Sequence, residues 1–312
     1  MGAVSATIGP SIWRMPDYSS ARRDARWRGV RPERDLQKPG VVESLHQGFQ
    51  DGRQPIDVEA TFRWLDQIDR NPLAQELKGR MLDLCPVRNG HHVLDVGCGL
   101  GHEVLRLARL VGPQGIVVGI DANPSMIAEA QRRAAGETFG ICLEVGDAQY
   151  LAFPDNSFDL CRTERVLRYL ESPEAALAEM TRVARPGGCV LAFDFDSDQT
   201  VVDAPDSTLA RQVAELLDSA VPRPWIGRQL FRLFRGVGLI DVRVVPHAIC
   251  LSGATGFGIY RQLNQDTIAR AMQAGQITPA EVAAWWTALE HAAEAEAFFS
   301  ANLGFIVIGV KP

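Results

Sequence analysis

Four residues in one short segment have the types and spacing of a cofactor-binding turn. Asp95, Gly97, Gly99 and Gly101 alternate with other residues in the run VLDVGCGLGH, whose apolar start ends in a glycine-rich turn and which precedes a helical pattern. A glycine-rich turn between a strand and a helix presents backbone N–H groups and a helix N-terminus to a ligand. Such a turn serves dinucleotides, other nucleotides and adenosyl cofactors alike, so the spacing of the glycines has to discriminate among them.

The spacing disfavours a dinucleotide. The dinucleotide pattern G-x-G-x-x-G/A ends in a small residue that allows the helix to pack closely on the strand. Here the sixth position is His102, and the additional glycine, Gly101, comes one residue earlier. A nicotinamide cofactor is therefore disfavoured, and a P-loop is excluded because no G-K-[ST] follows the turn.

The elements around this turn predict an α/β fold. From residue 92, apolar runs such as VLDVG, GIVVGID and ICLEVGD alternate with amphipathic helical runs as far as CVLAFDF. This alternation is typical of a parallel sheet that is covered by helices on both faces. Asn123 with Pro124, and Ser172 with Pro173, each provide a capping side chain followed by proline at a helix start. Acidic residues end neighbouring strands, and the carboxyl ends of parallel strands meet at one edge.

The chain divides into four segments. Residues 1–40 form a basic arm, and residues 41–90 contain N-terminal helices that we expect to cover the sheet edge. Residues 91–200 form the cofactor-binding core, and residues 201–312 complete the core. Two helical runs separate the last two strand-like runs, a connection far longer than that of an ordinary hairpin. We therefore expect residues from about 251 to 300 to form a helical lid over the carboxyl ends of the strands.

The pattern D-x-G-x-G-x-G resembles motif I of class I S-adenosylmethionine-dependent methyltransferases. The resemblance extends over residues 55–200: Asp121 ends the second strand, Asp147 and Ala148 follow the third, and ALAEMTRVARPGGCVLAF resembles a segment of the ubiquinone and menaquinone methyltransferase group. It implies a Rossmann-like, doubly wound, mostly parallel seven-stranded sheet with an antiparallel last strand. It also implies S-adenosylmethionine as the cofactor.

The resemblance assigns roles within the cofactor site. Asp95 would orient the ammonium end of the cofactor, Asp121 would accept hydrogen bonds from the ribose diol, and Asp147 would lie at the adenine. Glycine is needed in the turn because a side chain would occupy the volume of the ligand. The cofactor-binding residues expected on these grounds are Asp95, Gly97, Cys98, Gly99, Gly101, Asp121, Ala122, Asp147, Ala148 and Arg162.

The acceptor is expected to be a small organic molecule. The stretch after the fourth strand, RTERVLRYL, lacks the [DN]-P-P-[YF] sequence of enzymes that methylate planar amines in nucleic acids or proteins. The arm and lid suggest an enzyme of secondary metabolism, by analogy alone. A fold that binds the same cofactor but catalyses a non-methylating step, such as a cyclisation, is the alternative.

Catalytic groups are harder to identify. Asp194, Asp196 and Asp198 follow one another in DFDSD at the end of the fifth strand. Asp196 is the candidate proton acceptor, and we expect no metal site because a hard cation would need further oxygen ligands. Arg165, Arg168 and Tyr169 are candidates to face the acceptor. His46 and His247 are the histidines to test, although each is expected to be structural.

Composition limits the remaining choices. The 312 residues are 46% hydrophobic, which is enough for a sizeable core. The arm has eight basic and four acidic residues, whereas the other 272 residues have 24 basic and 34 acidic, so nucleic acid is not an expected partner. We expect a cytoplasmic protein without an export leader or membrane segment, with six reduced cysteines and no disulfide framework. A homodimer is possible on general grounds.

Overall fold

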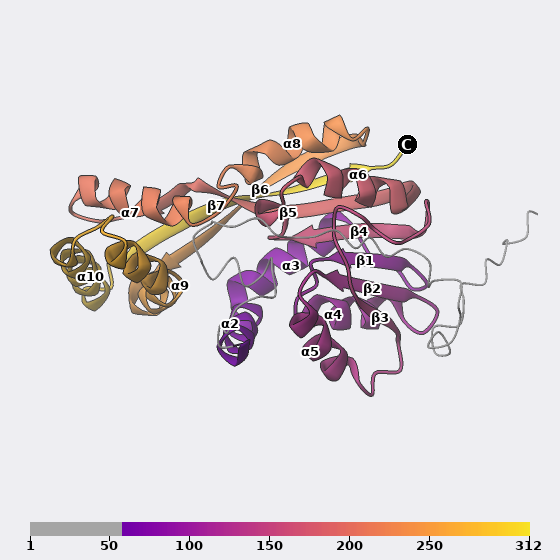
Figure 1. The fold of residues 1–312 in the computed structure, drawn as a ribbon, viewed down its shortest axis with the longest axis horizontal. Coiled ribbons are helices and arrows are strands. Elements are labelled where there is room, and N and C mark those ends of the chain that lie inside the picture. The colour runs from indigo at the N-terminus through magenta and orange to yellow at the C-terminus, as the bar shows by residue number, and fades with distance from the viewer. Residues whose placement is uncertain (1–57) are drawn as a thin grey trace, which may run out of the picture. The chain divides into compact units, whose positions relative to one another are not determined.

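The computed structural model describes residues 58–312, so the basic arm and His46 lie outside the described residues. Seven strands and the helices between them follow one another in the order that the sequence pattern predicts (Figure 1). The elements are α2 (Val58–Arg70), α3 (Pro72–Leu84), β1 (His92–Val96), α4 (His102–Val111), β2 (Ile116–Asp121), α5 (Pro124–Ala134), β3 (Gly140–Val145), β4 (Phe158–Glu164), a 3₁₀ turn η2 (Leu167–Tyr169), α6 (Pro173–Val183), β5 (Ala184–Val202), α7 (Ser207–Ser219), α8 (Ile226–Gly236), β6 (Ile240–Ser252), α9 (Gly253–Gln273), α10 (Pro279–Glu294) and β7 (Phe299–Val310).

The strands form one mixed sheet in the order β3-β2-β1-β4-β5-β7-β6. Strands β1 to β5 pair in parallel, and β7 is antiparallel to both of its neighbours, as expected for the last strand. From β1 the chain adds β2 and β3 on one side, and it then returns to add β4 and β5 on the other side of β1. In open α/β sheets ligands bind at the carboxyl ends of the strands at such a switch point. The topology therefore places the candidate site beyond the ends of β1 and β4.

Helices cover both faces of the sheet (Figure 1). Residues from α6 and α8, including Leu177, Met180 and Leu230, pack on one face. Residues from α3, α4 and α5 pack on the other. Burial of these apolar faces supplies the main stabilising force, at about 25 cal/mol for each Å² of apolar surface removed from water.

The position of α3 corrects one prediction. We expected the N-terminal helices to cover an edge of the sheet, but Leu77 and Met81 of α3 are 2% and 1% exposed and pack with Val93, Leu160 and Phe193 of β1, β4 and β5. Strands β1, β4 and β5 are the central strands, so α3 covers a face beside α4. The apolar spacing identified the helix correctly, but spacing alone carries no information about which part of the sheet it meets.

The predicted lid corresponds to α9 and α10, which join β6 to β7. Strand β4 pairs with β5 only as far as Phe193, and the rest of β5 continues to Val202 alongside β7. Helices α7, α9 and α10 form a third apolar cluster around this extension. Trp285 and Phe298 are each 1% exposed within it and form part of its core. Thr278 and Glu281 form a capping box at the start of α10.

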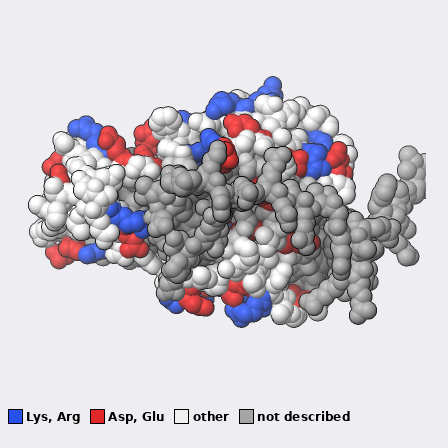
Figure 2. All heavy atoms as spheres, viewed as in Figure 1, with Lys and Arg blue, Asp and Glu red and all other residues white. Residues whose placement is uncertain are grey.

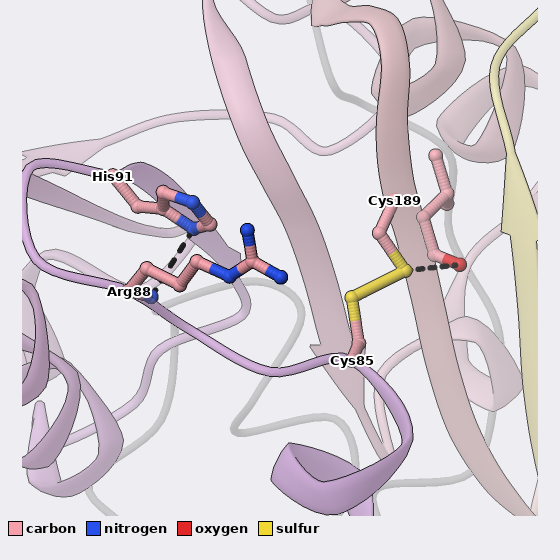
Figure 3. The surroundings of a disulfide bond; sticks show 5 residues. Cys85, Arg88, His91 and Cys189 are labelled. Carbon is pink, nitrogen blue, oxygen red and sulfur yellow. Dashed lines mark hydrogen bonds between the residues drawn. A yellow bond between two sulfur atoms is a disulfide. The ribbon is translucent and has the colours of Figure 1, made fainter.

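Two cysteines form a disulfide that the sequence did not predict. Cys85 follows α3 and Cys189 lies in β5, with their Cα atoms 6.8 Å apart (Figure 3). The expectation of six reduced thiols was therefore wrong for this pair. The two residues are 104 positions apart in the chain, and only the packing of α3 on the sheet face brings them together. Cys98, Cys142, Cys161 and Cys250 are free thiols.

Acidic and basic side chains are interspersed over the described residues that are visible in Figure 2. That face shows no continuous basic stripe of the kind that binds a phosphate backbone. No helix within residues 58–312 combines the length and apolar character needed to cross a membrane.

Candidate cofactor site

The glycine turn after β1 is shaped by its backbone. Gly97, Gly99 and Gly101 have φ angles of 76°, 52° and 77°, in the left-handed region that favours glycine. The amides of Gly97 and Cys98 donate to the carbonyl oxygen of Ile120 at the end of β2, at 2.8 and 2.9 Å. This anchors the turn against the neighbouring strand and leads directly into α4.

The turn leaves open space where the sequence predicts a ligand. A Cβ atom placed on Gly99 would meet no atom within 4 Å, whereas one on Gly97 would collide with the side chain of Val166. Gly101 packs closely on Ala130 of α5, so its lack of a side chain serves helix packing. Cys98 is buried, and its contact with a cofactor stays a prediction. The space at Gly99 therefore fits a cofactor that approaches the backbone there.

Asp121 closes the second side of this space. Its Oδ2 accepts a hydrogen bond from the amide of Gly99, and its Oδ1 accepts one from Asn123, both at 2.9 Å. Burial raises the pKa of Asp121 above its ordinary value, and the two backbone hydrogen bonds oppose that shift. Each carboxylate oxygen retains a second lone pair. The side chain can therefore still accept hydrogen bonds from the two hydroxyl groups of a ribose while it holds the turn in place.

Asp95 belongs to a buried network of charges that lies beneath the turn. Arg162 of β4 pairs directly with Asp95 of β1 in the sheet register, and its Nη1 is 3.3 Å from Asp95 Oδ1. The same guanidinium group contacts Glu103 at 3.5 Å and Glu164 at 2.8 Å. Arg162 is 3% exposed and its guanidinium group contacts three carboxylates, so it is placed to position Asp95. Its own contact with a cofactor stays a prediction.

Sequence reasoning missed three members of this network. Glu103 lies in the first turn of α4, Glu164 ends β4, and Lys78 of α3 contacts both Glu103 and Asp69. Glu164 could have been found, because it stands two residues after Arg162 and so points to the same face of the strand. Lys78 gives no such signal, since a lysine in an amphipathic helix is ordinarily exposed.

The charges of the network make Asp95 sensitive to pH. Burial raises the pKa of Asp95 to about 6, Arg162 opposes this, and Glu103 and Glu164 add to it. Glu164 differs: burial raises its pKa, but Arg165 and Arg162 outweigh burial and hold it at about 2. At neutral pH both carboxylates are therefore ionised, whereas Asp95 becomes protonated below about pH 6.

Cofactor affinity should fall as Asp95 is protonated. An ammonium group binds the carboxylate and not the carboxylic acid, so the dissociation constant of S-adenosylmethionine is expected to rise by up to tenfold per pH unit below about pH 6. Calorimetric titration between about pH 5 and about pH 8 measures this. The Asp95→Asn variant should bind weakly with a flat profile, and a wild-type affinity that is constant across this range would contradict the assignment.

The remaining predicted cofactor residues lie at the same edge of the sheet. Ala122 is exposed directly after Asp121. Asp147 is exposed and its Oδ1 accepts the amide of Gln149 at 2.8 Å, while Ala148 is buried with the apolar core. These residues follow β2 and β3, beside the glycine turn. Their contact with an adenine ring stays a prediction.

The three acids of the DFDSD segment lie within β5, which continues to Val202, and each contacts an arginine. Asp196 is fully buried, and both of its oxygens accept hydrogen bonds from Arg228 of α8, one of them also from the Arg228 amide. Asp198 contacts the same guanidinium group at 2.8 Å. Asp194 is fully buried and lies 3.4 Å from Arg168. Asp196 therefore fixes the start of α8, and its contacts do not support the proton-acceptor role that we predicted from the sequence.

The histidine candidate His247 is also structural. It is 5% exposed in β6, with its ring edge-on to Phe193 at a centroid distance of 6.1 Å, and burial lowers its pKa. Packing against the ring of Phe193 favours the structural role that the sequence predicts for this histidine.

Comparison with known proteins identifies the family. Residues 88–225 match the methyltransferase-domain family. An uncharacterised 37.1 kDa protein in transposon Tn4556 of Streptomyces fradiae is 36% identical over 250 residues, which cover 80% of this chain and 71% of that protein. The ubiquinone/menaquinone biosynthesis C-methyltransferase UbiE of Saccharophagus degradans is 37% identical over 147 residues, covering 46% of this chain and 59% of that enzyme.

The fold agrees with this assignment. Phosphoethanolamine N-methyltransferase 2 of Haemonchus contortus superposes with a TM-score of 0.55 at 20% identity, covering 88% of this chain and 61% of that protein. The chain contains a class I S-adenosylmethionine-dependent methyltransferase domain that is homologous to UbiE-type enzymes. Its methyl donor is S-adenosylmethionine.

Proposed function

We propose that the protein transfers the methyl group of S-adenosylmethionine to a small organic molecule, with the cofactor held by the turn at Gly97–Gly101, by Asp95 and by Asp121. The observation that carries the proposal is the convergence of Asp95, the open position at Gly99 and Asp121 at the switch point of the sheet. The bound sulfonium supplies an activated methyl group, so the protein's main tasks are orientation of the two reactants and exclusion of water.

The acceptor is proposed to bind beside the cofactor at the ends of β4 and β5. Glu164 ends β4, and Arg165 and Arg168 follow it. The extension of β5 leads from there to the helical cluster of α7, α9 and α10. A cluster outside the sheet that is joined to this edge is suited to recognise a small molecule, and we propose that it acts as the lid. A related enzyme, UbiE, is named for C-methylation in quinone biosynthesis, and we propose a comparable tailoring step, in secondary metabolism, for this chain.

The test is formation of S-adenosylhomocysteine together with a methylated product. Purified protein is incubated with S-adenosylmethionine and a library of small phenols, carboxylic acids and amines, and both products are quantified by mass spectrometry. The proposal predicts equal amounts of S-adenosylhomocysteine and methylated acceptor. A product whose mass shows no added methyl group, formed without S-adenosylhomocysteine, would instead identify a non-methylating enzyme on the same fold.

A further inference from the structure

The turn that follows β4 lies against the cofactor site. Glu164 ends the strand and belongs to the charge network of Asp95. Val166, two residues further on, fills the space where a side chain on Gly97 would otherwise stand. Arg165 therefore lies between a residue that belongs to the charge network, Glu164, and a residue that packs on the glycine turn, Val166.

Arg165 is held in an unfavourable backbone conformation. Its φ angle is 59°, in the left-handed region, and its amide donates to the carbonyl oxygen of Phe193 in β5 at 2.8 Å. A residue with a side chain costs about 1–2 kcal/mol in this conformation. Such strain persists only where the surrounding structure imposes it, and it is concentrated at functional sites. The turn thus sets the direction of one arginine side chain at the expense of stability.

The guanidinium group of Arg165 has unused hydrogen-bonding capacity. Its Nη2 lies 3.0 Å from Glu164 Oε1, and its Nε is buried without a hydrogen-bond partner among residues 58–312. The side chain is 29% exposed, so part of it reaches the surface of the described residues. A buried N–H without a partner is costly, and one that belongs to a charged group is costlier still. A ligand that supplies an acceptor at this position would remove that cost.

Arg168, three residues further along the chain, is a second arginine with a buried N–H group that lacks an acceptor among the described residues. It lies between the rings of Tyr169 and Phe195, at 5.9 and 5.8 Å from their centroids, and its terminal nitrogen donates to the Ser197 hydroxyl. Its Nε, like that of Arg165, has no hydrogen-bond partner in the part of the chain that the structure describes, although Asp194 Oδ1 lies 3.4 Å away. Two cationic groups within four residues therefore retain an unsatisfied N–H beside the cofactor turn.

The neighbouring carboxylates are engaged with arginines. Glu164 contacts Arg162 and Arg165, Asp194 contacts Arg168, and Asp196 contacts Arg228. An ion pair stabilises the ionised form of a carboxylate and so makes it a weaker base. Arg165 and Arg162 outweigh burial and hold the pKa of Glu164 at about 2, whereas burial raises the pKa of Asp194 to about 6 against the effect of Arg168. An acceptor that arrives already ionised requires no base. It would also complement the unsatisfied arginine N–H groups.

We propose that Arg165 binds the ionised oxygen of the acceptor, which is therefore a small molecule with a carboxylate or an acidic phenolate group. This inference rests on the proposed methyl transfer and names its substrate class. A lone pair of the oxyanion attacks the methyl carbon, the carbon–sulfur bond breaks with its electrons remaining on sulfur, and the products are a neutral ester or ether and S-adenosylhomocysteine. The acceptor proton has already gone to solvent. Arg168 positions the turn and does not contact the acceptor.

The test is equilibrium binding to the protein saturated with S-adenosylhomocysteine. Four probes share one ring: 4-nitrobenzoate and 4-nitrophenolate are anionic, and 4-nitrobenzamide and 4-nitroaniline are neutral. Calorimetry at about pH 8 should show binding of at least one anion at least tenfold tighter than that of its neutral partner. The Arg165→Gln variant should lose that preference, Arg165→Lys should keep part of it, and both should retain the affinity for S-adenosylhomocysteine. A guanidinium–oxyanion contact justifies an effect of this size.

A matched control is Arg109→Gln, which removes an exposed arginine at the far end of α4 and should leave all affinities unchanged. Equal binding of anions and neutral probes, or no anion binding to the wild-type complex, would overturn the proposal but leave the cofactor site intact. Loss of S-adenosylhomocysteine binding in Arg165→Gln would also overturn it, because Arg165 would then support the cofactor site. Failure of the wild type to bind S-adenosylhomocysteine would instead refute the proposed function. Preference for carboxylate over phenolate would identify the acceptor as an acid.

Discussion

Replacement of Arg162 by methionine is expected to destabilise the protein by about 3–5 kcal/mol, the cost of removing one partner from a buried ion pair. Arg162 is 3% exposed and contacts the carboxylates of Asp95, Glu103 and Glu164. Burial opposes its charge, but these three carboxylates raise the pKa of Arg162, so the guanidinium group is ionised at any accessible pH. Methionine preserves most of the buried volume and removes the charge. Among the described residues, the three carboxylates would then share Lys78, Arg106 and Arg165 as partners, and Asp95 would have lost its direct ion pair.

Urea denaturation of Arg162→Met measures this effect, with Arg109→Met as the control for an exposed arginine. Adding Glu164→Gln to Arg162→Met should restore part of the lost stability, because it removes one uncompensated charge. Cofactor affinity should fall together with stability, since Asp95 loses the group that orients it. A change in unfolding free energy below about 1 kcal/mol would show that the network tolerates the loss, contrary to the role assigned to Arg162.

Alanine substitutions in the cofactor turn should separate the effect of backbone strain from that of a steric collision. Gly97→Ala combines left-handed backbone strain with a collision against Val166, so a loss of about 2–4 kcal/mol in stability is expected. Gly99→Ala carries similar strain but meets no atom within 4 Å, so only about 1–2 kcal/mol should be lost. Both should bind S-adenosylmethionine at least tenfold more weakly, Gly99→Ala because its Cβ enters the volume assigned to the ligand.

Gly136→Ala provides the matched control for strain away from the site. Gly136 follows α5 with a φ angle of 98°, and a Cβ there would meet nothing within 4 Å. This variant should lose stability and keep its cofactor affinity. Adding Val166→Ala to Gly97→Ala should recover the part of the stability that is due to the collision. Unchanged S-adenosylmethionine affinity in Gly99→Ala would place the cofactor elsewhere.

Local patterns predicted the parts of this structure that depend on local chemistry. The alternation of apolar runs with capped helices identified the strands and their parallel pairing, and the glycine spacing identified the turn. Asp95 and Asp121 were identifiable because they end neighbouring strands, and parallel strands bring their carboxyl ends to one edge.

Features that depend on packing between distant segments were not predictable. Lys78 and Arg162 lie 84 positions apart and share Glu103 only because α3 packs across the sheet face. The same packing joins Cys85 to Cys189. Nothing in the sequence indicates that Asp196 is paired, because Arg228, which donates hydrogen bonds to its carboxylate, is 32 residues away in the chain. Spacing specifies which face a side chain occupies but not which partner it meets there.

The most direct test of the central claim is calorimetric titration of the protein with S-adenosylmethionine, repeated on Asp121→Ala. Asp121 joins the glycine turn to the end of β2, and its free lone pairs are assigned to the cofactor ribose. The wild type should bind, and the variant should bind more weakly by about 1–3 kcal/mol, the cost of leaving polar groups unpaired. Unaltered binding by a folded Asp121→Ala, or no binding by the wild type, would contradict the account.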